Sequence, residues 1–383
     1  MTQVTASAPG KLILLGEHAV VYRRPALVAA VDLRLTAVLR RRAGGAVHLS
    51  VPALGVQRQV SWPEIGAYTA AAGARWQAWA GGDRTAGFSA VRGDDPAHVP
   101  LLALGEAAAY LGERPAAVRR GSALPGLHLS LRSELPAGSG FGSSAAAALA
   151  IVAGYLALRG AAAPAADLER LALEVERRQH GLPSGVDGAT VLHGGVIWAE
   201  RDDRGGLAFT PSPAGSPLLS RFAVYDSGAP AETTGEVVAA VRARSAAEPA
   251  RYAALWDDLE AAARELRSLL ASGVDDAAAA VGLLRRGAAA LEAAGVVPAA
   301  VAERVRAIES AGGGAKISGA GSLAGPGAGC LLVVHPEPGR LAGLSALADL
   351  RRLPVRLGAP GLRVEPEPAA DRAAADRAAR GTR

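Results

Sequence analysis

The sequence predicts an α+β protein of two domains, a strand-rich N-terminal domain and a helix-rich C-terminal domain. The chain of 383 residues is long enough to form two hydrophobic cores. Alternating apolar residues near its start predict strands over Leu27–Leu39, Val47–Val51 and Val56–Trp62. The second half instead carries four segments of helical periodicity, with short strand-like runs before and after them.

Helices and strands continue through the rest of the N-terminal domain. Helical spacing over Pro100–Leu111 is followed by the alternating segment Leu127–Leu135, which predicts a half-buried strand. The Ala- and Gly-rich segment Ala70–Gly93 fits neither pattern. Further along we expect helices over Ala145–Leu158, Ala166–Gln179 and Pro183–Leu192, and a strand over Gly194–Glu200.

A segment rich in Asp, Gly, Pro and Ser, Arg201–Pro217, predicts the boundary between the domains. We therefore place the N-terminal domain at residues 1–205 and the C-terminal domain at 206–365. The composition of residues 366–383 predicts a disordered tail. The helices expected in the C-terminal domain are Thr234–Arg244, Tyr252–Leu270, Ala277–Ala294, Ala299–Ser310 and Leu341–Leu350. The strands expected there are Arg221–Tyr225, Ala315–Ser318, Gly329–His335 and Pro354–Val364.

The overall composition argues against several classes of protein. Lys and Arg number 41 and Asp and Glu 36, a difference of +5 that is spread along the chain, so we expect no nucleic-acid partner. The single cysteine, Cys330, cannot form an intrachain disulfide, which favours a reducing compartment. Neither a signal peptide nor an apolar window of about 18 residues is present, so we expect a soluble, cytoplasmic protein without a membrane partner.

The strongest functional signal is a glycine-rich loop between a predicted strand and a predicted helix, with the sequence Pro136-Ala-Gly-Ser-Gly-Phe-Gly-Ser-Ser144. Its glycines allow a tight bend that turns backbone N–H groups to one side, and the helix N-terminus adds free donors and positive partial charge. The pattern favours a phosphate cradle, with a structural turn capped by serine as the alternative. Its glycine spacing differs from the dinucleotide-binding and Walker patterns.

Only two lysines occur in this arginine-rich chain, Lys11 and Lys316, which favours a role for a compact ammonium group at each position. Lys11 opens an apolar run that ends in Gly16-Glu17-His18, where two ionisable groups follow residues suited to burial. An exposed turn between strands is the alternative. Lys316 lies in the glycine-rich segment Gly312–Gly321, which predicts a loop that approaches a ligand, or else a plain hairpin.

Acidic residues around one further turn form the last candidate group. In the segment His180-Gly-Leu-Pro-Ser-Gly-Val-Asp187 the acid follows Ser-Gly among apolar neighbours, where it would serve as a base, a metal ligand or a helix cap. Glu174 and Glu176 lie on the preceding helix. That helix brings one of their carboxylates back towards the phosphate loop, unless both face solvent.

Three of these motifs, in this order, resemble the GHMP kinases. Pro9–Val21 is similar to the first motif of that family, Pro136–Ala145 to its phosphate loop, and Ala315–Gly321 with Gly329-Cys330 to its third motif. The resemblance implies the two-domain GHMP-kinase-like fold, in which the C-terminal domain is ferredoxin-like. It also implies an ATP-dependent kinase that phosphorylates a small alcohol and uses Mg²⁺ as its cofactor.

Two segments narrow the choice of acceptor. Lys11–Tyr22 and Pro183–Asp187 are most similar to the family members that phosphorylate mevalonate. The resemblance therefore implies ATP and mevalonate as ligands, 5-phosphomevalonate as a product, and a place in isoprenoid biosynthesis. The alternatives are another small-molecule kinase of the family, acting on phosphomevalonate or a sugar, and a non-catalytic ligand-binding sensor of the same fold. A homodimer is also compatible with the resemblance.

The resemblance assigns chemical roles by position. It implies that Asp187 is the base that faces the acceptor hydroxyl, and that Lys11 beside it stabilises the developing charge. Ser144 and Glu176 would bind Mg²⁺, with Glu174 as the alternative to Glu176.

Binding roles follow in the same way, although two segments depart from the family pattern. Ala231–Gly235 lacks the Arg or Lys that usually stands near its threonine, and Ser322–Ala328 interrupts the third motif. The residues that would line the acceptor pocket are Glu17, His18 and Thr234, and those of the third-motif loop are Lys316, Gly319 and Gly321. The backbone amides that would hold the triphosphate belong to Pro136, Ala137, Gly138, Ser139, Gly140, Phe141, Gly142, Ser143 and Ser144.

Overall fold

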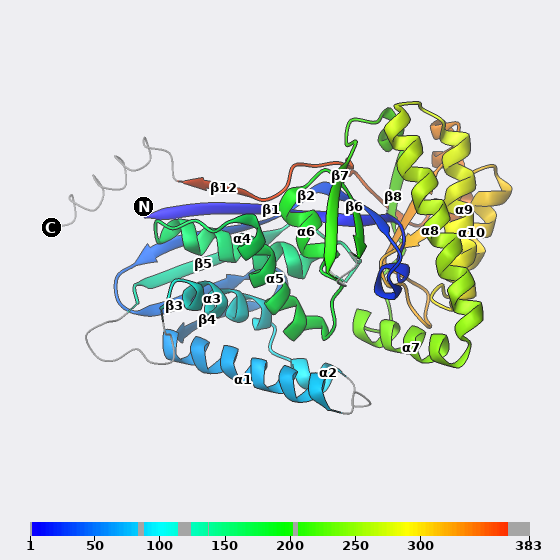
Figure 1. Cartoon of the computed structure of the whole chain (residues 1–383). Helices are drawn as coiled ribbons and strands as arrows, with labels where there is room; N and C mark the ends of the chain where they lie inside the picture. The colour runs from blue at the N-terminus through cyan, green and yellow to red at the C-terminus, as the bar shows by residue number, and fades with distance from the viewer. Residues whose placement is uncertain (1, 83–87, 114–123, 137, 202–205, 367–383) are drawn as a thin grey trace.

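A computed structural model of the chain describes residues 2–82, 88–113, 124–136, 138–201 and 206–366. Two sheets, each covered by helices, lie side by side (Figure 1). The larger sheet holds the N-terminal strands, and the helices of the C-terminal half pack around the smaller one. The two-part α+β architecture predicted from the sequence is confirmed.

Within the described residues the larger sheet has eight strands. Their order is β12-β1-β2-β5-β3-β4, with β6 beside β2 and β7 beside β6. Every pair in it is antiparallel except β3 with β5. Its strands are β1 (Gln3–Leu15), β2 (Ala26–Arg42), β3 (Ala46–Val51), β4 (Val56–Ser61), β5 (Gly126–Ser133), β6 (Val196–Arg201), β7 (Leu207–Ser212) and β12 (Arg363–Pro366).

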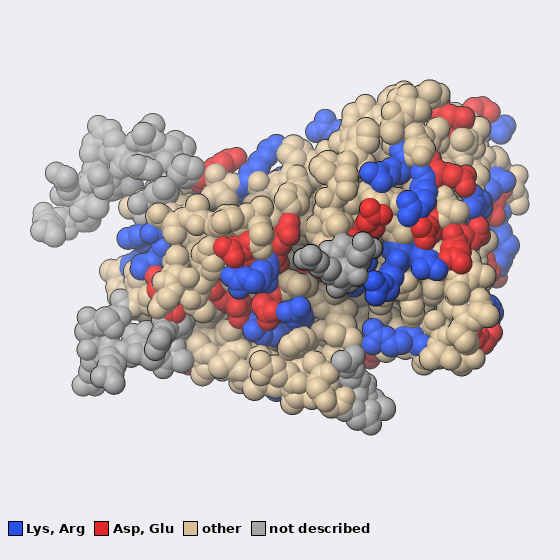
Figure 2. Space-filling view, in the orientation of Figure 1, with Lys and Arg blue, Asp and Glu red and all other residues tan. Residues whose placement is uncertain are grey.

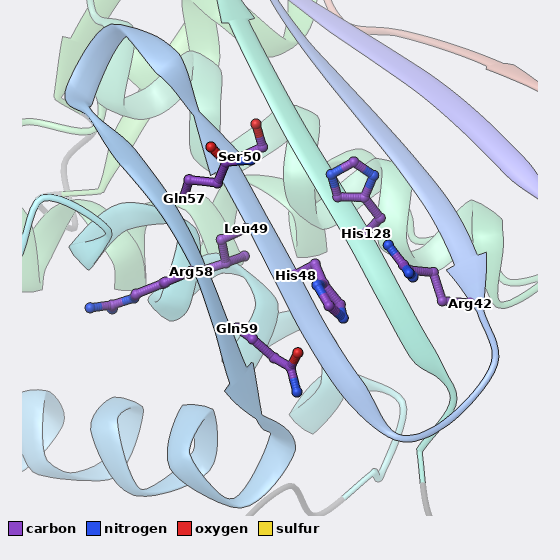
Figure 3. Close-up of a pocket in the computed structure, with 8 residues that line it drawn as sticks. All are labelled: Arg42, His48, Leu49, Ser50, Gln57, Arg58, Gln59 and His128. Carbon is purple, nitrogen blue, oxygen red and sulfur yellow. The ribbon is translucent and has the colours of Figure 1, made fainter.

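Around β5, β3 and β4, helices cover one face of the larger sheet and leave the other open. Side chains alternate between the faces along each strand, so Val47 and Leu49 of β3 are buried whereas His48 and Ser50 are half-buried on the other face. This polar, open face appears in Figure 3. The helices on the covered side are α1 (Trp62–Gly81), α2 (Phe88–Arg92), α3 (His98–Tyr110), α4 (Ser143–Leu158), α5 (Ala165–His180) and α6 (Val186–His193).

Helix α4 is central to this domain. It packs against β1 and β2 on one side and against α3 and α5 on the others, so almost its whole circumference is buried. Its sequence is accordingly apolar all round, as expected of a helix enclosed by neighbours. The packing fixes the N-terminus of α4, and with it the glycine-rich loop, over the middle of the molecule.

The smaller sheet, as far as the structure describes the chain, has four antiparallel strands in the order β11-β8-β10-β9, the strand order of a ferredoxin-like domain. Its strands are β8 (Phe222–Asp226), β9 (Gly314–Ser318), β10 (Cys330–Val334) and β11 (Arg351–Leu353). The helices of this domain are α7 (Thr234–Ala247), α8 (Pro249–Ser272), α9 (Ala277–Ala293) and α10 (Ala299–Ser310).

Charges of both signs are interspersed over the face of the molecule that Figure 2 shows. Arg286 on α9, for example, pairs with Asp258 and Glu265 of α8 at 3.1 and 2.7 Å.

Within the described residues, no helix is both long and apolar enough to cross a membrane.

The predicted domain ranges were 1–205 and 206–365, but two strands of the larger, N-terminal sheet lie after residue 205. Strand β7 forms within the segment expected to be a linker and pairs with β6, and β12 returns from the chain's end to pair with β1. The pairing of β12 satisfies backbone groups along one edge of β1, which sequence periodicity does not reveal. Pro366, expected in the tail, ends β12, and residues 367–383 lie outside the described residues.

Two further expectations need correction, and one segment left unassigned by its sequence can now be assigned. The unassigned segment Ala70–Gly93 belongs largely to α1 and α2. Instead of a helix over Leu341–Leu350 there are two short 3₁₀ turns, Pro338–Gly343 and Ser345–Leu347, because Gly343 disfavours a continuous helix. The expected strand Pro354–Val364 contains two prolines and two glycines and forms mainly irregular structure before β12.

Candidate active site

The glycine-rich loop adopts the cradle conformation that its sequence predicts. Gly138, Gly140 and Gly142 have φ values of 71°, 78° and 70°, a left-handed region that favours glycine, and α4 begins directly after Gly142. A Cβ atom on Gly142 would lie 3.0 Å from Cγ of Lys11, so the backbone and that side chain are in close contact. The loop therefore presents a helix N-terminus with its free amide donors beside Lys11. Ala137 lies outside the described residues.

Lys11 and Asp187 meet at this loop, as the sequence predicts. The Lys11 Nζ atom on β1 lies 3.0 Å from Oδ1 of Asp187, in the first turn of α6. The Lys11 backbone N–H also donates to the carbonyl oxygen of Phe141 at 2.9 Å, which ties β1 to the loop. Lys11 is 4% exposed, whereas the Asp187 side chain is 33% exposed and lines a cavity. The acid is thus the member of the pair that an incoming molecule reaches.

Glu176 on α5 lies at the base of the same cavity. Its side chain is buried, and its Oε1 atom has no hydrogen-bond partner among the described residues. Burial, reinforced by the charge of Asp187, raises the pKa of the Glu176 carboxyl to about 8. A buried carboxylate oxygen without a partner is a fitting ligand for a cation, because a cation would stabilise the ionised form.

Ser144 at the start of α4 is held by a histidine to which the sequence assigned no role. Its Oγ atom lies 3.0 Å from Nε2 of His180, the last residue of α5. Burial lowers the pKa of His180 to about 4, so the ring is neutral near pH 7. A neutral ring nitrogen can accept the Ser144 proton, which leaves the hydroxyl oxygen free to bind a cation. His180 opens the segment that contains Asp187, and that position was its only sequence signal.

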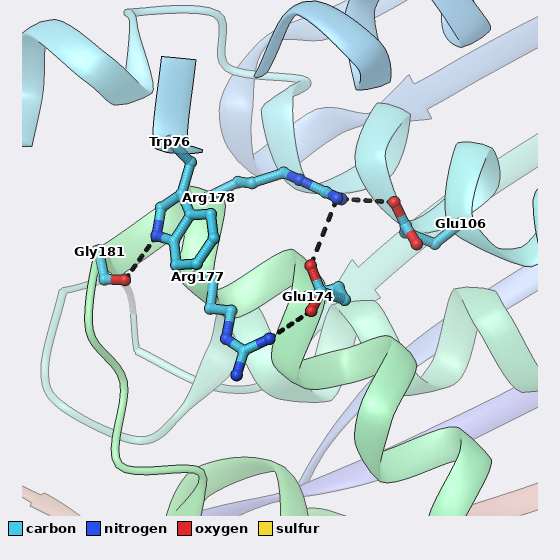
Figure 4. A network of polar contacts seen from close by, with 6 residues as sticks. All are labelled: Trp76, Glu106, Glu174, Arg177, Arg178 and Gly181. Atoms are coloured by element: carbon cyan, nitrogen blue, oxygen red, sulfur yellow. Dashed lines mark hydrogen bonds and ion pairs between the residues drawn. The ribbon is translucent and has the colours of Figure 1, made fainter. Parts of the chain in front are cut away.

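Glu174, the alternative to Glu176, belongs to a separate polar network (Figure 4). Its carboxylate is paired with Arg177 and Arg178, and Arg178 also bonds Glu106 of α3 at 2.5 Å. Residues two apart on a helix do not share a face, so the two glutamates point to different surroundings. Glu174 is already paired with cations and does not line the cavity of the glycine loop.

Glu17 is the clearest departure from the residues predicted for the acceptor pocket. It does not line the cavity, because its carboxylate is fully buried and forms an ion pair with Lys316 of β9. Lys316, expected in the third-motif loop, is equally buried and lies on the strand before that loop. Beside this pair, Ser318 Oγ donates to the carbonyl oxygen of Ile13 at 3.0 Å and accepts from its N–H at 2.9 Å. These contacts join β1 of the first domain to β9 of the second.

His18 and Thr234, in contrast, both line the cavity. His18 has a φ of 57°, uncommon for a residue with a side chain, and its Nε2 donates to the carbonyl oxygen of Ala320 at 2.9 Å. Burial lowers the pKa of His18, so the ring is neutral and its Nδ1 is left as an acceptor. Thr234 is the first residue of α7, whose capping box is formed by Thr233 and Glu236.

The third motif reaches the glycine loop through Gly319. A Cβ atom on Gly319 would lie 3.7 Å from Cα of Gly140, whereas Gly321 packs against the carbonyl group of Val296 and does not line the cavity. The interrupting segment Ser322–Ala328 packs against the residues before α7. Ser322 Oγ and the Leu323 N–H donate to Oε2 of Glu232 at 2.5 and 2.9 Å. The interruption therefore leaves the contact between the third motif and the glycine loop intact.

The cavity that these residues surround has a volume of about 580 Å³, which suits small-molecule ligands. Polar groups from the glycine loop, β1, α5 and α6 gather at one wall. Elsewhere its lining includes Trp79 and Phe88, packed edge to face with their ring centroids 4.9 Å apart, and Arg242 of α7. The sequence pointed to none of these three residues as part of the site, because their segments carry no motif.

Comparisons with known proteins agree with this arrangement. A family model for the N-terminal domain of GHMP kinases matches residues 104–195. The mevalonate kinase of Mus musculus is 30% identical over 298 residues, which cover 69% of both chains. The chain belongs to the GHMP kinase family. This GHMP kinase is also 28% identical to the mevalonate kinase of Thermococcus onnurineus over 95% of its own length and 98% of the relative.

Solved structures confirm the predicted GHMP-kinase fold. A crystal structure of mevalonate kinase superposes with a TM-score of 0.70 over 92% of this chain and 98% of that chain, at 19% identity. The L. major mevalonate kinase in complex with R-mevalonate gives a TM-score of 0.65 over 93% and 96% of the two chains, also at 19% identity. The glycine loop lies within the matched part of this GHMP kinase, between β5 and α4.

Proposed function

We propose that this GHMP kinase transfers the γ-phosphoryl group of ATP to the 5-hydroxyl group of mevalonate, giving 5-phosphomevalonate and ADP for isoprenoid biosynthesis. The observation that carries this proposal is the Lys11–Asp187 ion pair at 3.0 Å, placed against Gly142 of the glycine loop. Support for mevalonate as the acceptor comes from the relatives, which are named mevalonate kinases and match up to 95% of this chain.

In this proposal Asp187 accepts the proton of the acceptor hydroxyl while the hydroxyl oxygen attacks the γ-phosphorus and the bond to ADP breaks. The Lys11 ammonium group stabilises the negative charge that develops on the acceptor oxygen. Amide groups of the glycine loop and the N-terminus of α4 stabilise the phosphate charge. Phosphoryl transfer depends on this positioning and charge stabilisation more than on covalent catalysis.

The residues that we assign to Mg²⁺ are Glu176 and Ser144. Among the described residues, no group of three or more His, Cys, Asp or Glu side chains is arranged to hold a metal ion. Mg²⁺ commonly binds one or two protein groups together with phosphate oxygens, so the pair is sufficient when nucleotide is present. Bound there, the ion would neutralise charge on the phosphates of ATP.

Mg²⁺ binding with nucleotide is expected to strengthen as the pH rises, because a cation requires the ionised form of Glu176. The raised pKa of about 8 means that the carboxyl is mostly protonated below that pH. Between about pH 6.5 and about pH 8 the Mg²⁺ dissociation constant, measured by calorimetry with a non-hydrolysable ATP analogue, is expected to fall about tenfold.

Two variants test this assignment. Glu176→Gln is expected to weaken Mg²⁺ binding and to remove most of its pH dependence. Glu174→Gln is the matched control, since it alters the neighbouring network and leaves the cavity unchanged. An unaltered pH slope in Glu176→Gln would reject Glu176 as the cation ligand.

The carboxylate group of mevalonate needs a cationic partner that the segment before α7 does not supply. Glu232 in that segment is bonded to Ser322 and Leu323. Arg242, two helical turns after Thr234 on α7, is the one guanidinium among the described residues that line the cavity. Arginine suits carboxylate recognition because its planar group donates two parallel hydrogen bonds. We therefore assign substrate-carboxylate binding to Arg242.

Replacing Arg242 is accordingly expected to affect the acceptor and not the nucleotide. Loss of a charge-assisted hydrogen bond corresponds to about 1.5–3 kcal/mol, so Arg242→Ala should raise KM for mevalonate about 10- to 100-fold. The KM for ATP should stay within about twofold of the wild-type value, and Arg242→Lys should recover part of the loss. Steady-state kinetics with each substrate varied in turn measure both constants. An unchanged KM for mevalonate would assign carboxylate recognition to another residue.

The proposed activity is tested by measuring ADP formation with mevalonate, phosphomevalonate, galactose and homoserine as separate acceptors. Mevalonate is expected to give the highest kcat/KM, and the product is expected to carry phosphate on its 5-hydroxyl group by ³¹P NMR. A higher kcat/KM with another acceptor would replace mevalonate by that alcohol. Binding of ATP and mevalonate without ADP formation would instead indicate a sensor.

Two further proposals concern the molecule in the cell. We propose a cytoplasmic location, consistent with the single, buried cysteine. We also propose a homodimer, which light scattering of the purified protein tests directly, because a monomer mass at micromolar concentration would reject it.

A further inference from the structure

A second cavity, of about 370 Å³, lies on the open face of the larger sheet, opposite the side covered by α4 (Figure 3). Strand register explains which side chains meet there. His128 of β5 is the direct partner of Arg40 on β2 and of His48 on β3, and His48 is the partner of Gln59 on β4. Direct partners point to the same face, so these four side chains form one row across four strands.

This row places cationic or proton-accepting groups side by side without an acidic partner. Arg42, one position further along the same face of β2, joins His48 and His128 in the lining of the cavity. Among the described residues no hydrogen bond or ion pair is formed by the side chains of these three residues. The lining contains no Asp or Glu.

The neighbouring arginines are already engaged. Arg58 lies on the other side of β4 and pairs with Asp95 at 2.7 Å, and Arg40 donates to the amide oxygen of Gln3. Like charges in directly opposed positions destabilise a sheet, so a proton on His128, directly opposite Arg40, is unfavourable unless an anion offsets its charge. Ser50, Gln57 and Gln59 add neutral hydrogen-bond groups around the same cavity.

We propose that this cavity binds a tetrahedral oxyanion, such as the phosphate group of a small metabolite, through Arg42, His48 and His128. The guanidinium group of Arg42 supplies a permanent charge, and each imidazole supplies a second donor when protonated. The volume exceeds that of phosphate alone, which leaves room for a small organic group beside Ser50 and Gln57. This binding site lies outside the candidate active site and is independent of the proposed kinase activity.

The site is expected to depend on pH. The charged and titratable groups around it are Arg40 and Arg42 from β2, His48 from β3, His128 from β5 and Arg58 from β4, which is paired with Asp95. Burial and then the charges of Arg42, Arg40 and His48 lower the pKa of His128. A bound dianion reverses the effect of those charges, so binding should raise the pKa of the imidazoles and strengthen as the pH falls below about 6.5.

The direct test is a histidine titration of the wild-type protein by NMR. The Cε1–H resonances of the seven histidines are followed from about pH 5 to about pH 8.5, in sodium sulfate and in sodium chloride of equal ionic strength. Sulfate remains a dianion throughout, so the ligand itself does not titrate. His48 and His128 are expected to show pKa values higher by about 0.5–1 unit in sulfate, a difference that the histidines outside the cavity should not share. Inorganic phosphate at constant pH should shift the same two resonances.

Two charge-matched variants separate a defined site from general attraction. Arg42→Gln removes the proposed anchor, and Arg132→Gln removes the same charge from the same sheet face outside the cavity. Sulfate affinity should fall about tenfold in the first and less than about twofold in the second. Wild-type His48 and His128 that titrate identically in sulfate and chloride would overturn the proposal. An equal loss of affinity in both variants would also overturn it, because it would show non-specific attraction.

Discussion

Asp187→Ala is expected to lower kcat by about 10²- to 10⁴-fold, because the acceptor hydroxyl then loses the base that takes its proton. Asp187 is the exposed member of the pair with Lys11, and it faces the cavity beside the glycine loop. Asp187→Asn should be similarly impaired although it keeps the shape of the side chain, since an amide cannot accept the proton. The affinity for ATP should stay within about threefold of the wild-type value, because the loop amides are unchanged.

The measurement pairs steady-state turnover with fluorescence titration of a nucleotide analogue. Asp32→Asn provides a control, since Asp32 pairs with Arg356 at 2.8 Å on the surface and does not line the cavity. Retained turnover in both Asp187 variants would remove Asp187 from the chemistry. A loss of nucleotide affinity as large as the loss of kcat would show that Asp187 acts in binding and not in proton transfer.

The meeting of Lys11 with Asp187 could be predicted because the motifs that contain them resemble those of the GHMP kinases. The glycine loop could be predicted from the residues themselves, since the conformation of Gly138–Gly142 is set by residues adjacent in sequence. Strongly periodic elements such as α4 and β2 were found within a few residues of their observed ends. For the loop and these elements, short-range patterns were sufficient to determine the local structure.

Contacts between distant segments could not be predicted in this way. Lys316, the partner of Glu17, is 299 residues further along the chain, and β12 pairs with β1 although nearly the whole sequence separates them. His180 has no sequence pattern that separates it from other histidines, because its contact with Ser144 depends on how α5 packs beside α4. The sequence identified Glu17 as important and assigned it to the wrong surroundings, since the motif does not show which way its side chain turns.

The structure explains why this arginine-rich chain keeps lysine at two positions. Both lysines are buried, at 4% and 0% exposure, and each is paired with a carboxylate from one of the predicted motifs. A guanidinium group is bulkier and needs more hydrogen-bond partners than a buried pocket of this kind provides. The retained lysines therefore mark two places where a compact charge is enclosed, one at the cavity and one between the domains.

Lys316→Met should be the most destabilising of the substitutions considered, because it leaves the Glu17 carboxylate buried without its partner. Removing one member of a buried ion pair typically costs about 3–5 kcal/mol, whereas replacing both members can be nearly neutral. The double variant Glu17→Gln/Lys316→Met should therefore recover more than half of the free energy of unfolding lost in Lys316→Met. Urea denaturation followed by circular dichroism gives the free energy of unfolding of the wild type, the single variant and the double variant. Arg286→Met is the control, because it breaks an exposed ion pair and should lower the free energy of unfolding by less than about 1 kcal/mol.

The pH dependence of this loss separates a structural role from a role in substrate binding. Burial raises the pKa of Glu17 above its ordinary value of 4.5, so ionised Glu17 opposes folding when Lys316 is absent. For a carboxyl whose pKa is raised in the folded state, stability is greatest below the unfolded pKa and declines as the pH rises. The deficit of Lys316→Met should thus shrink as the pH falls towards about 4.5. If Glu17 instead contacts mevalonate, Glu17→Gln would raise KM, the double variant would recover no stability, and the deficit would not change with pH.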